Sequence, residues 1–417
     1  MKGSYLLFDC DNFFVSCERA FQPKLKNIPV VVLSNNDGCV VSRSNEAKKA
    51  GIKMCAPYFK IADTLKAMGG KALSSNYELY ADMSNRVMSL LRTYFNTLEV
   101  YSIDEAFTHT EDISDLTAKG LKIRNDILRQ TGISVSVGIA PSKTLCKVAG
   151  EQAKTFATDK VLHLQTEEEI KQVLSKLDAT DIWGIGKNLN AKLNFLGIFT
   201  ALELYNMPLS LARKKFGINL ERTILELRGY SCLEEDKHEA QKTIICSRSF
   251  EHEIYSFDEL KTILADFVNM ACKRLREQKS LACGLIVGIE SNRFKENFYQ
   301  NSHLVSLNES SANTARFIEA MNEGLKRIYR EKIGYKRAGI TLIDITGEAH
   351  CQHDLFCPQT NNLKDTKLMA AFDAINQKLG AKSIYFGAQS QGVNHFIKRG
   401  LKSPSYTSSW AELLKVS

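Results

Sequence analysis

The sequence YSIDEAF, residues 101–107, constrains the fold of this chain more than any other stretch. Two adjacent acids, Asp104 and Glu105, interrupt a run of residues that otherwise indicates a pair of buried strands. Adjacent residues on a regular strand point to opposite faces, so two acids that serve one site require a tight turn between strands. We therefore expect a β-hairpin that holds both carboxylates at the rim of a sheet. An exposed turn with solvated acids is the alternative, since turns are rich in such residues.

A third acid ends another expected strand. The short apolar run at residues 5–8 is too brief for a helix and is followed by Asp9. Three carboxylates hold two cations about 4 Å apart, one lowering the pKa of an attacking hydroxyl and one neutralising a leaving pyrophosphate. The acids therefore predict a two-metal centre for phosphoryl transfer, with Mg²⁺ as a hard cation suited to carboxylates.

Composition is typical of a multidomain protein without membrane segments. The chain has 417 residues, 24% of them charged, and a formal net charge of +8, which permits a polyanion partner without demonstrating one. Its length predicts three or four modules of about 100–150 residues. No apolar stretch approaches the roughly 20 residues of a membrane span, so we expect a cytoplasmic protein with no membrane partner. Eleven cysteines without CxxC pairs indicate reduced thiols.

Five ordered motifs resemble the Y-family translesion DNA polymerases, and the resemblance runs nearly from end to end. They are LLFDCDNFFVSCE, NNDGCVVSRSNEAKKAGIKM, YSIDEAF, VSVGIAPSKTLCKVAGEQAK and WGIGKNLNAKL. The tail, with YFGAQ and KRGLKSPSYT, is similar to the UmuC branch of that family, the polymerase subunit of bacterial DNA polymerase V. The resemblance implies an error-prone, Mg²⁺-dependent DNA-directed DNA polymerase, a nucleotidyltransferase. It adds dNTPs to a primer 3′ end opposite damaged template, in SOS mutagenesis and DNA damage tolerance.

The resemblance also implies an α+β, multidomain right-hand fold. Strand, helix, strand, strand, helix, strand is the order expected of a ferredoxin-like palm with small fingers inserted. After a polar linker the same order returns, which matches the family's little finger, also expected to be ferredoxin-like. The expected domains are a palm (residues 1–28 and 76–165), fingers (29–75), a helix-hairpin-helix thumb (166–230), a linker (231–243), a little finger (244–346) and a C-terminal clamp- and partner-binding tail (347–417).

The same resemblance assigns the acids to catalysis. Asp9 and Asp104 are expected to bridge two Mg²⁺ ions, with Glu105 on the metal nearest the attacking oxygen and the Cys10 carbonyl on the other. In the adjacent pair Phe13-Phe14, Phe14 occupies the family's steric-gate position, where an aromatic ring clashes with a ribose 2′-OH. Both rings are candidates for the nucleotide site, and packing in a core is the alternative for each.

Polar side chains of two other motifs are expected to bind the triphosphate of the incoming dNTP. Ser42, Arg43 and Lys48 belong to the expected fingers, and Lys154 belongs to the GEQAK stretch. A solvated helix face is the alternative for the lysines. Asn45 stands where many relatives have a tyrosine, which puts a phosphate contact from that position in doubt.

The stretch WGIGK contains a GIG turn between two expected helices. Its residues Gly184, Ile185, Gly186 and Lys187 predict the hairpin of a helix-hairpin-helix. Glycines let the backbone approach a phosphate, and the amides of the next helix point at it, so the hairpin binds DNA without reading its sequence. A simple turn is the alternative. Basic residues of the little finger are further candidates for the DNA backbone, with ordinary surface charge as the alternative: Arg248, Arg293, Lys336 and Arg337.

The tail carries a short peptide motif. Gln352, Leu355 and Phe356 fit the QxxLF form of sliding-clamp peptides, in which a glutamine hydrogen-bonds and a Leu-Phe pair fills an apolar pocket. The UmuC resemblance implies a UmuD′-like accessory subunit and the RecA filament as partners, besides primer-template DNA and dNTP. Nearby His and Cys residues match no common zinc spacing: His350, Cys351, His353 and Cys357.

Two other functions stay open on the sequence alone. A nucleotide cyclase also uses a ferredoxin-like palm with paired acids, but it leaves the GIG turn and the second βαββαβ pattern unexplained. A non-enzymatic DNA-binding scaffold is the second alternative, and the intact set of three acids argues against it.

Overall fold

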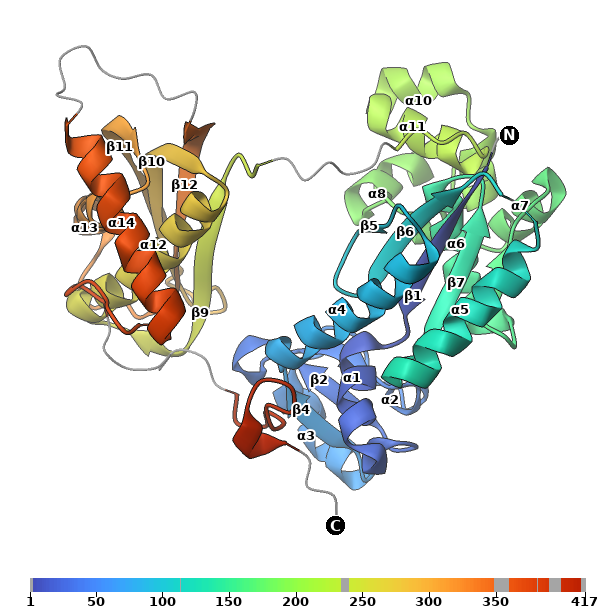
Figure 1. Ribbon diagram of the computed structural model, residues 1–417. Helices are drawn as coiled ribbons and strands as arrows, with labels where there is room; N and C mark the ends of the chain where they lie inside the picture. The colour runs from blue at the N-terminus through green and yellow to red at the C-terminus, as the bar shows by residue number, and fades with distance from the viewer. Residues whose placement is uncertain are drawn as a thin grey trace. The chain divides into compact units, whose positions relative to one another are not determined.

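A computed structural model describes residues 3–112, 114–233, 240–348, 360–380, 382–389 and 399–413, with backbone only for 360–363. The contacts divide the chain into two compact units, residues 1–237 with 399–417, and residues 238–398. The chain therefore leaves the first unit, forms the second, and returns to the first at its C-terminal end (Figure 1).

The first unit is built on a five-stranded sheet, the central sheet. Its strands are β1 (Ser4–Cys10), β5 (Glu99–Val100), β6 (Glu105–Thr110), β7 (Val135–Ala140) and β8 (Val161–His163). Their order is β5-β6-β1-β7-β8, and β1 pairs antiparallel with both β6 and β7. Without β8 at the edge, this is the arrangement of the ferredoxin-like palm that the element order predicted.

Helices cover both faces of the central sheet, which explains why its strands are apolar throughout. Leu6 and Phe8 of β1 pack with α4 (Tyr77–Tyr94) and α5 (Leu116–Thr131) on one face. Leu7 packs with α6 (Lys143–Phe156) on the other face. Side chains alternate along a strand, so Asp9, two residues after Leu7, points to the α6 face.

A second group of elements lies between β1 and α4 in the sequence. Its strands β2 (Val30–Leu33), β3 (Val40–Arg43) and β4 (Lys71–Ser74) form a small sheet of order β3-β2-β4. All four residues of β2 are buried, and Ser44 caps α2 by accepting from the amide of Ala47. The helices of this region are α1 (Phe13–Phe21), α2 (Asn45–Lys49) and α3 (Tyr58–Ala67).

A helical module follows the central sheet in the sequence and packs into the same core as α6. Thr166 and Thr200 each begin a helix with a capping box, so backbone amides of the first turn are satisfied. The helices are α7 (Glu167–Leu174), α8 (Lys187–Phe195), α9 (Ala201–Asn206), α10 (Leu209–Phe216) and α11 (Ile218–Leu227).

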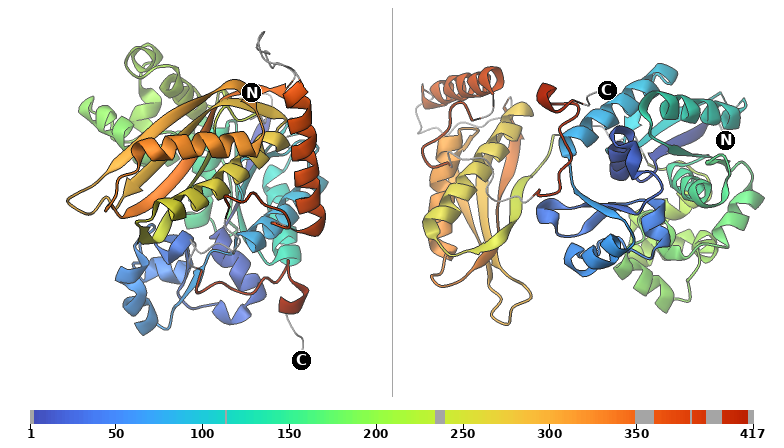
Figure 2. Two further views of the ribbon diagram at one scale, coloured as in Figure 1. Left: turned by 90° about the vertical axis from the view of Figure 1, so that its left-hand side faces the viewer. Right: turned by 90° about the horizontal axis from the view of Figure 1, so that it is seen from below.

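The second unit is a four-stranded sheet with helices packed on it (Figure 2). Its elements are β9 (Ile244–Ile254), α12 (Phe257–Glu277), β10 (Ser280–Ser291), β11 (Gln300–Ser311), α13 (Thr314–Ile328), β12 (Tyr335–Gly347) and α14 (Thr360–Leu379). Ion pairs from Arg276 to Asp373 and from Arg316 to Asp365 attach α14 to this unit. In the described part of the chain, no helix is both long and apolar enough to cross a bilayer.

The strand order of the second unit corrects one expectation. Its elements follow the predicted βαββαβ sequence, but the sheet order is β11-β10-β12-β9. In the central sheet the first strand of the βαββαβ order, β1, lies between the third, β6, and the fourth, β7. In the second unit the fourth strand, β12, lies between the first, β9, and the second, β10. The expectation of a ferredoxin-like little finger is therefore wrong in strand order. Periodicity identifies strands, but it does not say which distant strands pair.

Candidate active site

The first strand and the hairpin bring the three acids to one edge of the central sheet. Asp9 lies opposite Glu105 in the β1–β6 pairing, and the amide of Cys10 donates to the carbonyl of Asp104 at 2.9 Å. Residues directly opposite each other in an antiparallel pair point to the same face, with Cβ atoms roughly 5 Å apart. The carboxylates of Asp9 and Glu105 therefore both lie on the α6 face.

Ser102 holds the turn that leads into β6. Its hydroxyl donates to Oδ1 of Asp104 at 2.6 Å and accepts from the amides of Asp104 and Glu105 at 3.3 and 3.1 Å. These bonds fix the backbone before the regular strand begins. The side chain of Asp104 therefore does not have to follow the alternation of faces along β6. Sequence reasoning missed this residue. A serine two positions before an acid in an expected turn is the signal, because serine hydroxyls bond nearby backbone amides in turns.

Two lysines of α6 lie against two of the acids. Nζ of Lys154 is 2.8 Å from Oδ2 of Asp9, and Nζ of Lys147 is 3.0 and 2.9 Å from the carboxylate oxygens of Glu105. The lysines are seven residues apart, about two helical turns, so they share the face of α6 that covers this edge of the sheet. Lys143 on the same helix is 2% exposed and pairs with Glu99 instead.

Aromatic rings surround Lys147. Its Nζ lies 4.6 Å from the ring centroid of Tyr101, 5.1 Å from that of Trp183 and 6.0 Å from that of Phe107. An ammonium group over aromatic faces is attracted by the ring quadrupoles. Lys147 is therefore held beside Glu105 by rings from the hairpin and from the WGIGK turn, and sequence reasoning did not single it out as a partner of that acid.

The environment of Asp9 disfavours its charged form. The pKa of Asp9 is raised from 3.8 to about 7, chiefly by burial, with smaller contributions from the charges of Glu105 and Asp104 and against the opposing effect of Lys154. Carboxylate oxygens under mutual repulsion fit a hard divalent cation such as Mg²⁺. Among the residues that the structure describes, no group of three His, Cys, Asp or Glu side chains is arranged to hold a metal ion. Asp9 and Glu105 instead form ion pairs with Lys154 and Lys147.

The two adjacent phenylalanines have different environments. Phe13 is 3% exposed and belongs to the core beneath the central sheet. Phe14 is half-buried and stacks on Tyr80, with ring centroids 4.4 Å apart. Phe14 is therefore the ring with a surface available to a ligand, and Phe13 serves packing.

The basic residues expected at the triphosphate lie near one another. Loss of hydration and the positive charges of Arg43 and Lys154 lower the pKa of Lys48. The charges of Lys48 on α2, Arg43 on β3 and Lys154 on α6 therefore influence one another. Ser42 is 7% exposed and its hydroxyl lies 3.5 Å from the carbonyl of Asn12, directly before Phe13.

The GIG turn precedes α8 as expected, although a short 3-10 turn at Ala179–Asp181 stands where a first helix was anticipated. Gly184 has φ of 92°, a conformation that favours glycine. Ile185 is 6% exposed and its amide donates to the carbonyl of Ile182. The exposed residues of the turn are therefore Gly184, Gly186 and Lys187, and Ile185 packs inward.

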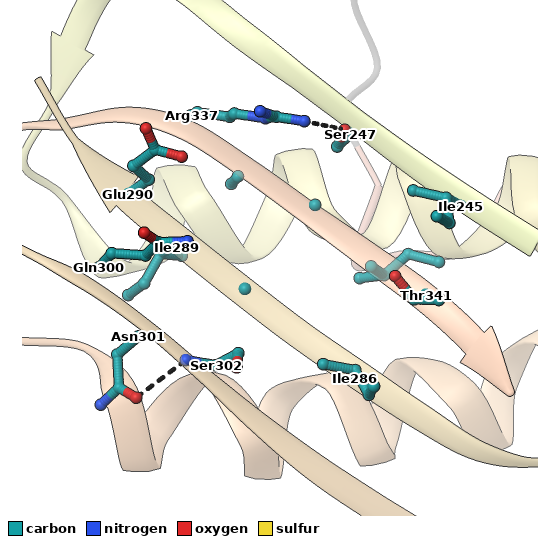
Figure 3. Close-up of a pocket in the computed structure, with 14 residues that line it drawn as sticks. Ile245, Ser247, Ile286, Ile289, Glu290, Gln300, Asn301, Ser302, Arg337 and Thr341 are labelled. Carbon is teal, nitrogen blue, oxygen red and sulfur yellow. Dashed lines mark hydrogen bonds between the residues drawn. The ribbon is translucent and has the colours of Figure 1, made fainter. Parts of the chain in front are cut away.

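The second unit has a hollow on the sheet face that carries Ile245, Ile286 and Thr341 (Figure 3). Its volume is about 290 Å³, and Arg337 reaches across the strands to the hydroxyl of Ser247 at 3.2 Å. Of the basic residues expected on DNA, Arg337 lines this hollow, whereas Arg293 pairs with Glu290. The clamp-motif residues Gln352, Leu355 and Phe356, and the His/Cys group at 350–357, lie outside the described residues.

Comparison with known proteins decides the family. The impB/mucB/samB family matches residues 8–151, and the C-terminal domain of that family matches residues 241–355. Protein UmuC of Salmonella typhimurium is 38% identical over 99% of this chain and 100% of its own length. The chain belongs to the UmuC, MucB, ImpB and SamB group of the Y-family DNA polymerases. Protein MucB of Escherichia coli, 35% identical over 98% of both chains, is similar too.

Solved structures show the same fold for this polymerase. A Y-family DNA polymerase chimera of Dbh and Dpo4 has a TM-score of 0.65 and 23% identity, covering 82% of this chain and 99% of its own. An insertion ternary complex of Dbh DNA polymerase has a TM-score of 0.52 at the same identity, with the same shares covered. The expected α+β fold, family and activity are confirmed. The protein is a UmuC-like translesion DNA polymerase, which excludes the nucleotide cyclase.

The C-terminal residues have a match of their own. Residues 366–416 match a domain of unknown function, DUF4113. This range spans most of α14 in the second unit and the returning segment in the first.

The raised pKa of Asp9 predicts a pH-dependent effect of removing its charge in metal-free protein. Between pH 3.8 and about 7 the unfolded chain releases this proton while the folded chain retains it, so Asp9 lowers stability progressively as pH rises through that window. Asp9→Asn removes this penalty. We expect the substitution to raise Tm by at least about 3 °C more at pH 8 than at pH 5, in EDTA. Thermal unfolding followed by circular dichroism measures it, and an equal effect at both pH values would contradict the assigned environment.

Proposed function

We propose that this polymerase transfers nucleotidyl groups at Asp9, Asp104 and Glu105 with two Mg²⁺ ions. The observation that supports the proposal is the placement of Asp9 opposite Glu105, with Asp104 fixed in the adjoining turn. When bound, the two ions supply activation of the primer 3′-hydroxyl and neutralisation of the leaving pyrophosphate. The three carboxylates would hold these ions, and the backbone carbonyl of Cys10 would contribute a further oxygen.

The basic residues bind the substrate triphosphate. Lys154 gives up its contact with Asp9 for a phosphate oxygen when the dNTP enters, which frees the carboxylate for its cation. Arg43 and Ser42 of β3 and Lys48 of α2 reach the same triphosphate. Lys147 stays on Glu105, because three rings and the carboxylate already surround its ammonium group.

Phe14 selects the sugar. Its ring stands against the ribose position of the incoming nucleotide, where a 2′-OH has no room. The stacked ring of Tyr80 supports Phe14 from behind, so the phenylalanine cannot retreat without losing that contact.

The remaining parts of the chain bind DNA. We assign the palm to residues 1–28 and 76–165, the fingers to 29–75, the thumb to 166–230, the linker to 231–243, the little finger to 244–346 and the tail to 347–417. The exposed residues of the GIG turn, Gly184, Gly186 and Lys187, contact the phosphate backbone of the primer-template. Arg337 on the open sheet face contacts it in the second unit.

The cellular role follows that of the UmuC group. The chain acts in the cytoplasm, in SOS mutagenesis and tolerance of DNA damage. Gln352, Leu355 and Phe356 bind the sliding clamp, and a UmuD′-like subunit and the RecA filament are further partners.

Replacing one acid tests the catalytic proposal. Asp104→Ala should reduce Mg²⁺-dependent primer extension below detection, because one of the three carboxylates that would hold the ions is lost. Primer-template affinity should stay within about threefold, since backbone phosphate contacts dominate DNA affinity. Extension assays and fluorescence anisotropy measure the two quantities. Glu111→Gln, an exposed acid just beyond β6, is the matched control and should leave both unchanged. Substantial residual synthesis by Asp104→Ala would refute the assignment.

Replacing the proposed gate tests sugar selection. Phe14→Ala opens space for a 2′-OH, so the ratio of kcat/KM for a dNTP to that for the matching rNTP should fall by at least about tenfold, about 1.4 kcal/mol. Single-nucleotide incorporation kinetics measure this ratio. Phe13→Leu, a change within the core, is the control and should keep discrimination. Unchanged discrimination in Phe14→Ala would remove the gate role.

A further inference from the structure

The C-terminal segment 399–413 returns to the first unit and packs beside the elements that carry Phe14 (Figures 1 and 2, dark red). Its residue Lys402 forms a parallel bridge with Ser74 at the end of β4, and the amide of Ser74 donates to the carbonyl of Leu401 at 3.1 Å. Asp37 of the small sheet region accepts from the amide of Gly400 at 3.2 Å. The segment therefore extends the small sheet by a short parallel contact.

The next residues of the segment enter a buried polar network. Nδ2 of Asn76, which precedes α4, donates to the hydroxyl of Ser403 at 2.9 Å. That hydroxyl donates to Oε1 of Glu18 at 3.0 Å, and the hydroxyl of Tyr80 donates to the same oxygen at 2.8 Å. Glu18 and Asn76 are fully buried and Ser403 is 6% exposed. A buried carboxylate needs such donors, because burial without them carries a large free-energy cost.

An aromatic contact fixes the same segment to α1. Tyr406 is 6% exposed and stacks on Phe21, with ring centroids 5.0 Å apart and planes 6° apart. Phe14, Glu18 and Phe21 follow one another at intervals of four and three residues, so they lie on one face of α1. The C-terminal segment thus contacts two of the three residues on the face that carries the proposed gate.

We propose that residues 399–406 are a positioning element for the sugar gate, acting on Phe14 through Glu18 and Tyr80 and through the contact of Tyr406 with Phe21 on the same face of α1. The hydroxyls of Ser403 and Tyr80 donate to the same oxygen of Glu18. The hydrogen bond from Ser403 therefore restricts the positions from which the Tyr80 hydroxyl can reach that oxygen. The Tyr80 ring in turn supports the Phe14 ring, with planes 13° apart. This gives the C-terminal part of the DUF4113 match a function: the end of the chain completes the wall behind the nucleotide site. The inference rests on the proposed gate role of Phe14.

Two substitutions weaken the chain of contacts at different points in the full-length protein. Ser403→Ala removes the hydroxyl that Glu18 accepts from, with little change of volume. Tyr406→Ala removes the ring that stacks on Phe21. Each has a matched control in the same segment: Ser405→Ala removes a hydroxyl that contacts Lys402 instead, and Tyr406→Phe keeps the stacked ring.

The measurement is the ratio of kcat/KM for a dNTP to that for the matching rNTP, with Tm recorded for every variant. We expect Ser403→Ala and Tyr406→Ala to lower this ratio at least about threefold, within the range of coupling between residues of one network. The two controls should keep it. In a Phe14→Ala background the same substitutions should lower it no further, because the residue that they position is gone.

Each outcome separates the positioning role from a purely structural one. A lower Tm with unchanged sugar discrimination in Ser403→Ala and Tyr406→Ala would overturn the proposal, because the segment would then stabilise the fold without positioning the gate. A loss of discrimination that persists in the Phe14→Ala background would also overturn it, because the effect would bypass Phe14. Failure of the gate itself is distinguishable, since Phe14→Ala alone would then leave discrimination unchanged.

Discussion

The antiparallel pairing of β1 with β6 is the constraint on which the site depends. It sets Asp9 opposite Glu105, and because opposite residues point to one face, two carboxylates that are distant in sequence meet without further adjustment. A slip of one residue would turn one of them to the other face of the sheet. The apolar residues that precede Asp9 prevent such a slip, since Leu7 packs with α6 while Leu6 and Phe8 pack under α4 and α5.

The same face carries the charges that balance the acids. α6 presents Lys147 and Lys154 to Glu105 and Asp9, so two positive charges offset part of the negative charge of this partly buried acidic cluster. The two lysines differ in their surroundings. Lys147 lies among three rings, whereas Lys154 shares its electrostatic environment with Lys48 and lies where a triphosphate is proposed to bind. Lys147 is therefore suited to a permanent contact with Glu105, and Lys154 to exchanging Asp9 for a phosphate.

The sequence predicted which strands and helices form better than it predicted which strands pair. The short apolar run before Asp9 predicted a strand, and the acid pair predicted a hairpin, although Glu105 lies in β6 itself and only Asp104 lies in the turn. Apart from β8, the central sheet has the ferredoxin-like order. The second unit has the predicted elements in a different strand order, because periodicity holds no information on which strands pair across long separations. Contacts such as Ser403 with Glu18 join residues 385 positions apart, and no local pattern marks them.

Electron paramagnetic resonance with Mn²⁺ in place of Mg²⁺ tests the central claim most directly, that the three acids form one two-cation site. The full chain would be bound to primer-template DNA and a non-hydrolysable dNTP. We expect the spectrum of two magnetically coupled Mn²⁺ ions, since carboxylates shared by a pair of cations hold them about 4 Å apart. A spectrum of isolated Mn²⁺ ions alone would contradict the account.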